Sequence, residues 1–164
     1  MLHGIGVAAR ALALFLVLNA PAAADQLGDG LAAYGGGRFA AALQLLQPLA
    51  EQGDARAQFT LGDMYMFGEG VARDAGQAVT WYRLAADHDY PNAQYALGFM
   101  YLNGLGVARD YVQAMAWFEI CARHAGFTYF GSRSADLVKR KMTPAQIAAA
   151  HAAAQAWKAI PAEP

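Results

Sequence analysis

The sequence reads AQFTLGDMY at residues 57–65 and AQYALGFMY at residues 93–101, 36 positions later. The correspondence continues through GEGVARD at residues 68–74 and GLGVARD at residues 104–110. Two 36-residue units therefore align without a gap, and 17 of their positions are identical. A fixed period of this length indicates helical units that stack on one another and bury a shared core.

The first half of each unit predicts an amphipathic helix, over residues 57–67 and residues 93–103. Its shared apolar residues recur at i, i+4, i+7 and i+8, which places them on one buried face. They are Ala57, Leu61, Met64 and Tyr65. Gly62 lies inside this helix and recurs as Gly98, although glycine costs about 1 kcal/mol against alanine there. We therefore expect a neighbouring helix to cross closely at this position, and Gly68 to end the helix.

The second half of each unit predicts a helix that starts after an aspartate, over residues 75–88 and residues 111–125. Asp74 and Asp110 are good N-cap residues, and each is followed three residues later by a glutamine. This spacing predicts a capping box, in which the glutamine reaches back to the start of the helix. The inward face is expected to hold Ala78, Trp81 and Ala85, with their equivalents Ala114, Trp117 and Cys121.

Both ends of the array depart from the period. In the first unit, residues 42–46 keep the spacing of a second helix, but the first helix ends near Tyr34 and the loop after it is shorter. Such a degenerate unit is typical of a terminal cap. At the other end, residues 135–142 predict one more first helix, with Ser132 in the linker before it.

The last helix is predicted from its start signal. Thr143-Pro144-Ala145-Gln146 combines an N-cap, a proline at the first helical position and the glutamine of a capping box, which predicts a helix over residues 144–159. Its inward face would hold Ile147, Ala150, Ala154 and Trp157. We interpret residues 127–164 as C-terminal capping helices, a hairpin that closes a repeat array over residues 25–126.

The repeated pattern resembles that of the Sel-one-like repeat family, a relative of the tetratricopeptide repeats. The residues that carry it are Leu61-Gly62…Tyr65-x-x-Gly68-x-Gly70-Val71-x-x-Asp74-x-x-Gln77-Ala78-x-x-Trp81-Tyr82…Ala85-Ala86. The resemblance implies an all-α fold, a right-handed α-solenoid of antiparallel helix pairs, with two full repeats, the degenerate N-terminal unit and the C-terminal capping hairpin. It also implies a role in protein–protein contacts, commonly as an adaptor, and no catalytic residues.

Residues 1–24 have the three-part organisation of a secretory signal peptide. Arg10 supplies the positive charge, residues 11–18 are an uninterrupted apolar run, and three alanines precede a cleavage site expected after Ala24. The alternative is an uncleaved membrane anchor, but an anchor needs about 20 apolar residues, and this run is shorter. We therefore expect an exported chain that starts at Asp25, periplasmic or secreted, with no stable membrane insertion after cleavage.

Composition argues against several classes of protein. The chain has 12 Lys+Arg and 13 Asp+Glu, and its net charge of −1 argues against a nucleic-acid binder that neutralises phosphates. Its single cysteine rules out a disulfide scaffold and a cysteine-built metal site. Alanine fills 39 of the 164 positions, which favours helices that stack closely. Charge is uneven, because residues 25–119 hold 11 acidic residues and five arginines, whereas residues 120–164 hold two acidic and six basic residues.

Several features could carry chemistry, and each also has a structural interpretation. The paired glycines of residues 68–70 and their repeat could cradle a phosphate, but a dinucleotide fingerprint needs a preceding strand, so we predict turns. Asp87-His88-Asp89 could bind a metal, but a histidine at a helix end is also favoured by the helix dipole. Cys121 could be a nucleophile, but it aligns with Ala85 and is predicted to be a buried thiol. His151 has no partner near it in the sequence. We therefore expect that the chain is not an enzyme and has no cofactor and no metal site.

The candidate binding residues lie on the first helices, in a stripe at i, i+4 and i+7 away from the predicted core face. Tetratricopeptide-type arrays line their concave face with these positions. Large apolar groups there point to an interaction site, because a solvated face does not need them. The predicted partner-binding residues are Phe59, Asp63, Met66, Tyr95, Phe99, Leu102 and Asn103.

These observations predict an adaptor or scaffold module that binds a protein partner, as a peptide or a helix, on its concave face. Three alternatives stay open at this point. The stripe could pack against the adjacent unit or the closing hairpin. The chain could be a small periplasmic enzyme acting on cell-wall material, or it could associate with itself through the same face.

Overall fold

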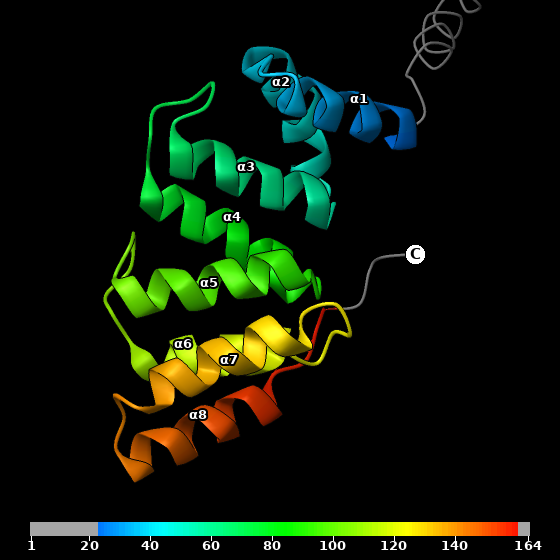
Figure 1. The fold of residues 1–164 in the computed structure, drawn as a ribbon. Coiled ribbons are helices and arrows are strands. Elements are labelled where there is room, and N and C mark those ends of the chain that lie inside the picture. Colours follow the sequence, from blue (N-terminus) through cyan, green and yellow to red (C-terminus); the bar gives the residue numbers. More distant parts are fainter. Residues whose placement is uncertain (1–22, 161–164) are drawn as a thin grey trace, which may run out of the picture.

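The computed structural model describes residues 23–160, and within them every regular element is an α-helix (Figure 1). The predicted all-α fold is confirmed. The predicted signal peptide lies outside the described residues, except for Ala23 and Ala24 at the start of the first helix. The helices are α1 (Ala23–Gly35), α2 (Phe39–Glu51), α3 (Ala55–Phe67), α4 (Ala75–Asp87), α5 (Pro91–Asn103), α6 (Tyr111–Cys121), α7 (Thr128–Lys139) and α8 (Pro144–Ala156).

The helices form a stack in which α1 to α7 each pack on their neighbours in the chain. α1 pairs with α2, α3 with α4 and α5 with α6, while α2 and α4 also pack on the first helix of the pair that follows. Figure 1 shows the pairs piled along one direction, from α1 and α2 at one end to α8 at the other. This arrangement is the solenoid that the 36-residue period predicts.

The predicted helix starts at the aspartates are confirmed. The Asp74 carboxylate accepts hydrogen bonds from the backbone N–H groups of Gly76 at 2.9 Å and Gln77 at 3.0 Å, and Asp110 caps α6 in the same way. The predicted return bond from the glutamine does not form in α4 or α6, and among the described helices only α8 has the complete capping box. The reason is that the backbone N–H of Asp74 donates instead to the Tyr65 carbonyl, at 2.9 Å.

Gly62 and Gly98 are explained by aromatic rings that lie across the first helices. A Cβ on Gly62 would lie 2.5 Å from the ring of Tyr82, and one on Gly98 would lie 2.6 Å from the ring of Phe118. Both rings are buried and come from the second helix of the same unit. The predicted close crossing is therefore confirmed, and a flat side chain is its cause.

Alanines and a cysteine fill inward positions of the second helices. Ala78, Ala85, Ala114 and Cys121 are fully buried. Trp81 departs from the prediction, because it is only partly buried and its neighbour Tyr82 takes the core position in α4. In α6 both Trp117 and Phe118 are buried, because α7 and α8 also pack on this helix.

The closing helices differ from the prediction in position and in packing. α7 covers Thr128–Lys139 rather than residues 135–142, so Ser132 lies within a helix and not in a linker. α8 ends at Ala156, earlier than the predicted residue 159. α7 and α8 both pack on α6 and do not pair with each other as a hairpin.

The position of α7 depends on a glycine at its contact with α6. Gly131, Ala135 and Val138 are buried and follow i, i+4, i+7 along α7. A Cβ on Gly131 would lie 2.6 Å from the carbonyl oxygen of Phe118, so a larger residue would push α7 away from α6. The prediction placed Gly131 before the helix, because the contact between Gly131 and α6 is a tertiary contact that leaves no pattern in the local sequence.

Candidate functional site

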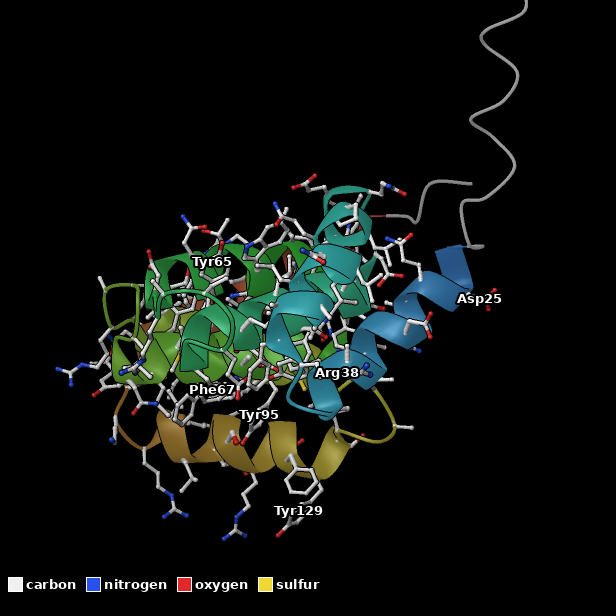
Figure 2. All side chains as sticks on the ribbon, turned by 90° about the horizontal axis from the view of Figure 1, so that it is seen from above. Asp25, Arg38, Tyr65, Phe67, Tyr95 and Tyr129 are labelled. Carbon is white, nitrogen blue, oxygen red and sulfur yellow. The ribbon has the colours of Figure 1, made fainter. Side chains whose placement is uncertain are left out.

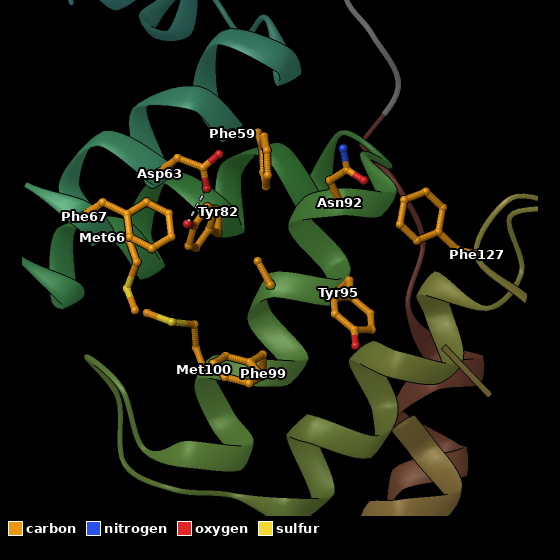
Figure 3. A pocket seen from close by; sticks show the side chains of 11 residues that line it. Phe59, Asp63, Met66, Phe67, Tyr82, Asn92, Tyr95, Phe99, Met100 and Phe127 are labelled. Atoms are coloured by element: carbon orange, nitrogen blue, oxygen red, sulfur yellow. Dashed lines mark hydrogen bonds between the residues drawn. The ribbon is translucent and has the colours of Figure 1, made fainter. Parts of the chain in front are cut away.

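A groove opens on the side of the stack formed by the first helices α3 and α5 (Figure 3). Its volume is about 420 Å³. In Figure 2, Phe67 and Tyr95 lie on the side where α7 runs, and Tyr65 lies on the opposite side. The lining consists of Phe59, Asp63, Met66 and Phe67 from α3, Tyr82 from α4, Asn92, Tyr95, Ala96, Phe99 and Met100 from α5, and Phe127 just before α7.

Five of the seven predicted binding residues line this groove. They are Phe59, Asp63, Met66, Tyr95 and Phe99. Leu102 does not, because it packs into the apolar cluster that joins α5 and α6 to α7 and α8. Asn103 is exposed at the end of α5, where its side-chain amide donates to the Phe99 carbonyl at 2.9 Å. The groove therefore follows all three predicted positions on α3, whereas on α5 it follows the first two and leaves the stripe at Leu102.

Sequence reasoning missed six lining residues. Tyr82 and Met100 were missed because they belong to helix positions that also face the core, and both are more than nine-tenths buried. Phe127 was missed because it lies after the last full helix pair. It reaches the groove because the chain turns back after α6 and α7 packs on α6. The other three, Phe67, Asn92 and Ala96, flank the predicted stripe on α3 and α5. For these three, helix geometry alone gave a usable signal.

The groove has an aromatic wall and an open mouth. Phe59 packs on Tyr82, with ring centroids 5.6 Å apart, and on Tyr90 at 5.3 Å. At the mouth, 64% of Phe67 and 48% of Phe99 stay exposed. Rings that pack on one another hold the wall rigid, while the exposed rings leave apolar surface for a ligand.

The C-terminal helices cover one edge of the predicted binding stripe. The hydroxyl of Tyr95 lies 3.3 Å from the hydroxyl of Ser134 on α7, while its ring packs on Phe118 of α6, with centroids 5.3 Å apart. Leu102 is covered by the same end of the molecule. The alternative that the closing helices pack on the stripe is therefore realised at these two positions, and not at Phe67 or Phe99.

Asp63 is the charged residue of the groove lining. The Tyr82 hydroxyl donates a hydrogen bond to its carboxylate at 2.7 Å (Figure 3). Burial raises the pKa of Asp63 above its usual value, the Tyr82 bond opposes that rise, and the negative charge of Glu69 adds to it. Burial and the neighbouring Asp63 charge also raise the pKa of Tyr82, which keeps its phenol protonated.

The sequence profile of the Sel1 repeat matches this chain three times, over residues 21–54, 55–90 and 91–124. The chain belongs to the Sel1 repeat family. Sel1 repeats generally act as protein–protein interaction modules and are typically non-enzymatic. The groove lies between the second and third Sel1 repeats, since α3 and α4 belong to the second match and α5 to the third.

Solved structures of Sel1 repeat proteins share the fold. The crystal structure of c5321, a protective antigen present in uropathogenic Escherichia coli strains and displaying an SLR fold, is 33% identical with a TM-score of 0.78, over 83% of this chain and 30% of that one. A Sel1 repeat protein from Oxalobacter formigenes is 33% identical with a TM-score of 0.56, over 59% of this chain and 40% of that one. The chain thus spans less than half the length of either protein. No curated protein matches it.

The glycine loops of the Sel1 repeats are turns, as predicted, and the structure places them at contacts between units. Gly68 and Gly104 end α3 and α5 in the left-handed conformation. Gly106 also has a positive φ of 66°, and a Cβ there would lie 2.1 Å from the carbonyl oxygen of Ala75. Each loop therefore packs its backbone against another helix, and the glycine pair is explained without a phosphate.

A repeated glutamine also joins successive Sel1 repeats. Gln58 is buried, and its side-chain amide donates to the Ala50 carbonyl at the end of α2, at 3.0 Å. The equivalent Gln94 donates to the Asp89 carboxylate at 2.9 Å. In each case the side-chain N–H of the glutamine is paired with an oxygen of the preceding unit, where one unit meets the next. The sequence showed the identity of the two glutamines but not their role.

Two of the described histidines, His124 and His151, contact carboxylates from distant parts of the chain. His124 lies with its Nε2 3.1 Å from the Asp89 carboxylate, and His151 lies with its Nδ1 2.8 Å from the carboxylate of Glu119. The His124 contact joins the turn after α6 to the turn between α4 and α5. His88 points elsewhere, beside Gly53. Within residues 23–160, no three His, Cys, Asp or Glu side chains gather as metal ligands would.

The thiol of Cys121 is buried, as predicted. It donates to the Pro91 carbonyl at 3.4 Å, and burial raises its pKa to about 11. A thiol with this pKa is almost entirely protonated at neutral pH and is a poor nucleophile.

Among the described helices, none has the length and apolar character to cross a bilayer.

Proposed function

We propose that this chain is an exported adaptor that binds an apolar segment of a protein partner in the groove between its second and third Sel1 repeats. The observation that carries the proposal is the exposure of Phe67 and Phe99 at the mouth of an aromatic groove. Exposure of apolar rings to water is unfavourable, and such exposure on a rigid wall is typical of an interaction site. Export is inferred from the signal-peptide pattern of residues 1–24.

The chemistry of the lining favours recognition over catalysis. Its eleven side chains include one carboxylate and two phenols, and no His, Lys, Arg, Cys or Ser. The described groove therefore offers apolar contact and a few polar anchors, which is the usual composition of a binding site. Nucleophilic catalysis would need a nucleophile such as Ser, Cys or Lys with a base beside it, and the lining offers none of these side chains.

The test replaces Phe99 by a photo-crosslinking phenylalanine analogue in cells of the source organism. The matched control places the same analogue at Leu137, which is 52% exposed on α7 and does not line the groove. We expect a discrete crosslinked partner from position 99 only. We also expect the crosslinked protein to be exported, with an N-terminal sequence that starts at Asp25. Binding of that partner to purified Phe99→Asp should fall by about thirtyfold, as for an interface hot spot, and Leu137→Asp should bind normally.

Three results would contradict this proposal. One is equal crosslinking from both positions, and another is undiminished binding to Phe99→Asp. The third is recovery of the chain with its leader intact in the cytoplasm, which would remove export. The unfolding midpoint of Phe99→Asp is the control for folding, and it should stay close to that of the parent protein because half of the ring is in water.

A further inference from the structure

The groove holds a carboxylate, Asp63, that has no cation beside it in the part of the chain that the structure describes. None of its lining residues is basic, and among residues 23–160 no Lys, Arg or His lies within salt-bridge distance of Asp63. The Tyr82 hydroxyl donates to one carboxylate oxygen, Oδ1, at 2.7 Å. The second oxygen of Asp63 has no hydrogen bond from the described residues, and it is free to accept one from a ligand.

The fold does not require a carboxylate at this position. The equivalent residue in the next Sel1 repeat is Phe99, on a helix of the same length that also ends at a left-handed glycine. A partly buried carboxylate without a cation lowers stability, and burial raises the pKa of Asp63 accordingly. A group that the fold does not need and that lowers its stability is better explained by binding.

We propose that the groove accepts an apolar peptide segment carrying one lysine or arginine, whose cation binds Asp63 while the flanking side chains contact the aromatic wall. This inference rests on the proposed function and specifies its ligand. The cation would take the free oxygen of Asp63, next to the rings of Phe59 and Tyr82. A charge-assisted bond in a partly dry site is stronger than one in water, and aromatic faces add attraction for a cation.

The charge of the surrounding array acts in the same direction. Residues 25–119 hold 11 acidic residues against five arginines, and Glu69 is close enough to Asp63 to add to the rise of its pKa. A negative array attracts a basic segment and repels an acidic one. We therefore expect discrimination against a segment with glutamate at the same place.

The test uses short synthetic peptides built from Leu, Met, Phe and Ala in varied order, flanked by Ser-Gly for solubility. Each order is made with Lys, Arg, norleucine or Glu at the centre, and binding is measured by fluorescence polarisation. Norleucine keeps most of the lysine stem and removes its charge. We expect the Lys and Arg peptides to bind the parent protein about tenfold more tightly than their norleucine counterparts, and the Glu peptides most weakly.

Asp63→Asn is the decisive variant, because its side-chain oxygen still accepts from Tyr82. It should bind Lys and norleucine peptides equally, whereas Glu51→Gln, outside the groove lining, should keep the preference. Equal binding of Lys and norleucine peptides to the parent would overturn this inference and leave the proposed function standing. Peptide binding that survives Phe99→Asp would overturn the proposed function. Binding of no peptide, or self-association that no peptide displaces, would overturn both.

Discussion

Gly62 and Gly98 are single residues with an effect on a whole helix pair. Each permits a buried aromatic ring of the second helix to lie against the first helix. Glycine lowers helix propensity, so its presence at the same place in both units shows that packing decides this position. A side chain as small as a methyl group would have to displace the ring of Tyr82 or Phe118.

Gly98→Ala should therefore be less stable than Gly28→Ala by about 1–3 kcal/mol, the usual effect of overpacking. Gly28 is the matched control, because it lies within α1 and has nothing within 4 Å of its Cβ position. Gly28→Ala should raise the free energy of unfolding by up to about 1 kcal/mol, through helix propensity alone. Urea unfolding followed by circular dichroism measures both. Equal gains in the two variants would show that the ring of Phe118 moves aside freely.

Asp63 predicts a pH dependence with a definite sign. Burial raises its pKa in the folded protein above the unfolded value, so the folded state binds the proton more tightly. Its contribution to stability is therefore greatest below the unfolded pKa, near 4, and is lost as pH rises through the folded pKa. Asp63→Asn should be more stable than the parent at pH 7, and this difference should shrink as pH falls toward 4. A difference that grows on acidification would mean that the ionised carboxylate stabilises the fold.

At the scale of elements, the start and end signals worked where they were local. The aspartate caps of α4 and α6 and the left-handed glycines after α3 and α5 are contacts within a few residues, so the sequence was enough to predict them. The missing glutamine bonds and the early start of α7 depend on a carbonyl of another helix, which no local pattern reveals.

Removal of α8 tests whether the closing helices are an integral part of the stack. α8 packs on α6, and Ala154 and Trp157 join the cluster that holds Trp117 and Ile120. Exposure of the last two side chains alone should cost about 3–6 kcal/mol. A chain that stops at residue 143 should thus unfold at a much lower urea concentration. A chain that stops at Trp157 keeps these contacts and is the control, and similar midpoints for the two truncations would contradict this account.

At the scale of the whole molecule, the described part of the chain is a stack of unequal units with an aromatic groove between the second and third. Three Sel1 repeats build the stack, and α7 and α8 close it on α6. The aromatic and methionine side chains of the second and third repeats meet at the groove, and Asp63 lies among them. Acidic residues dominate the array and basic residues dominate the C-terminal part.

The sequence by itself determined the helical class, the period, the capping aspartates and five of the groove residues. It could do so because a helix places i, i+4 and i+7 on one face, and because caps are local hydrogen bonds. Only the tertiary structure decided that Tyr82, Met100 and Phe127 complete the groove, that Leu102 is covered and that Asp63 has no cation beside it among residues 23–160. These features arise from contacts between helices that are distant in the chain, where the packing of one ring or one glycine sets which side chains meet.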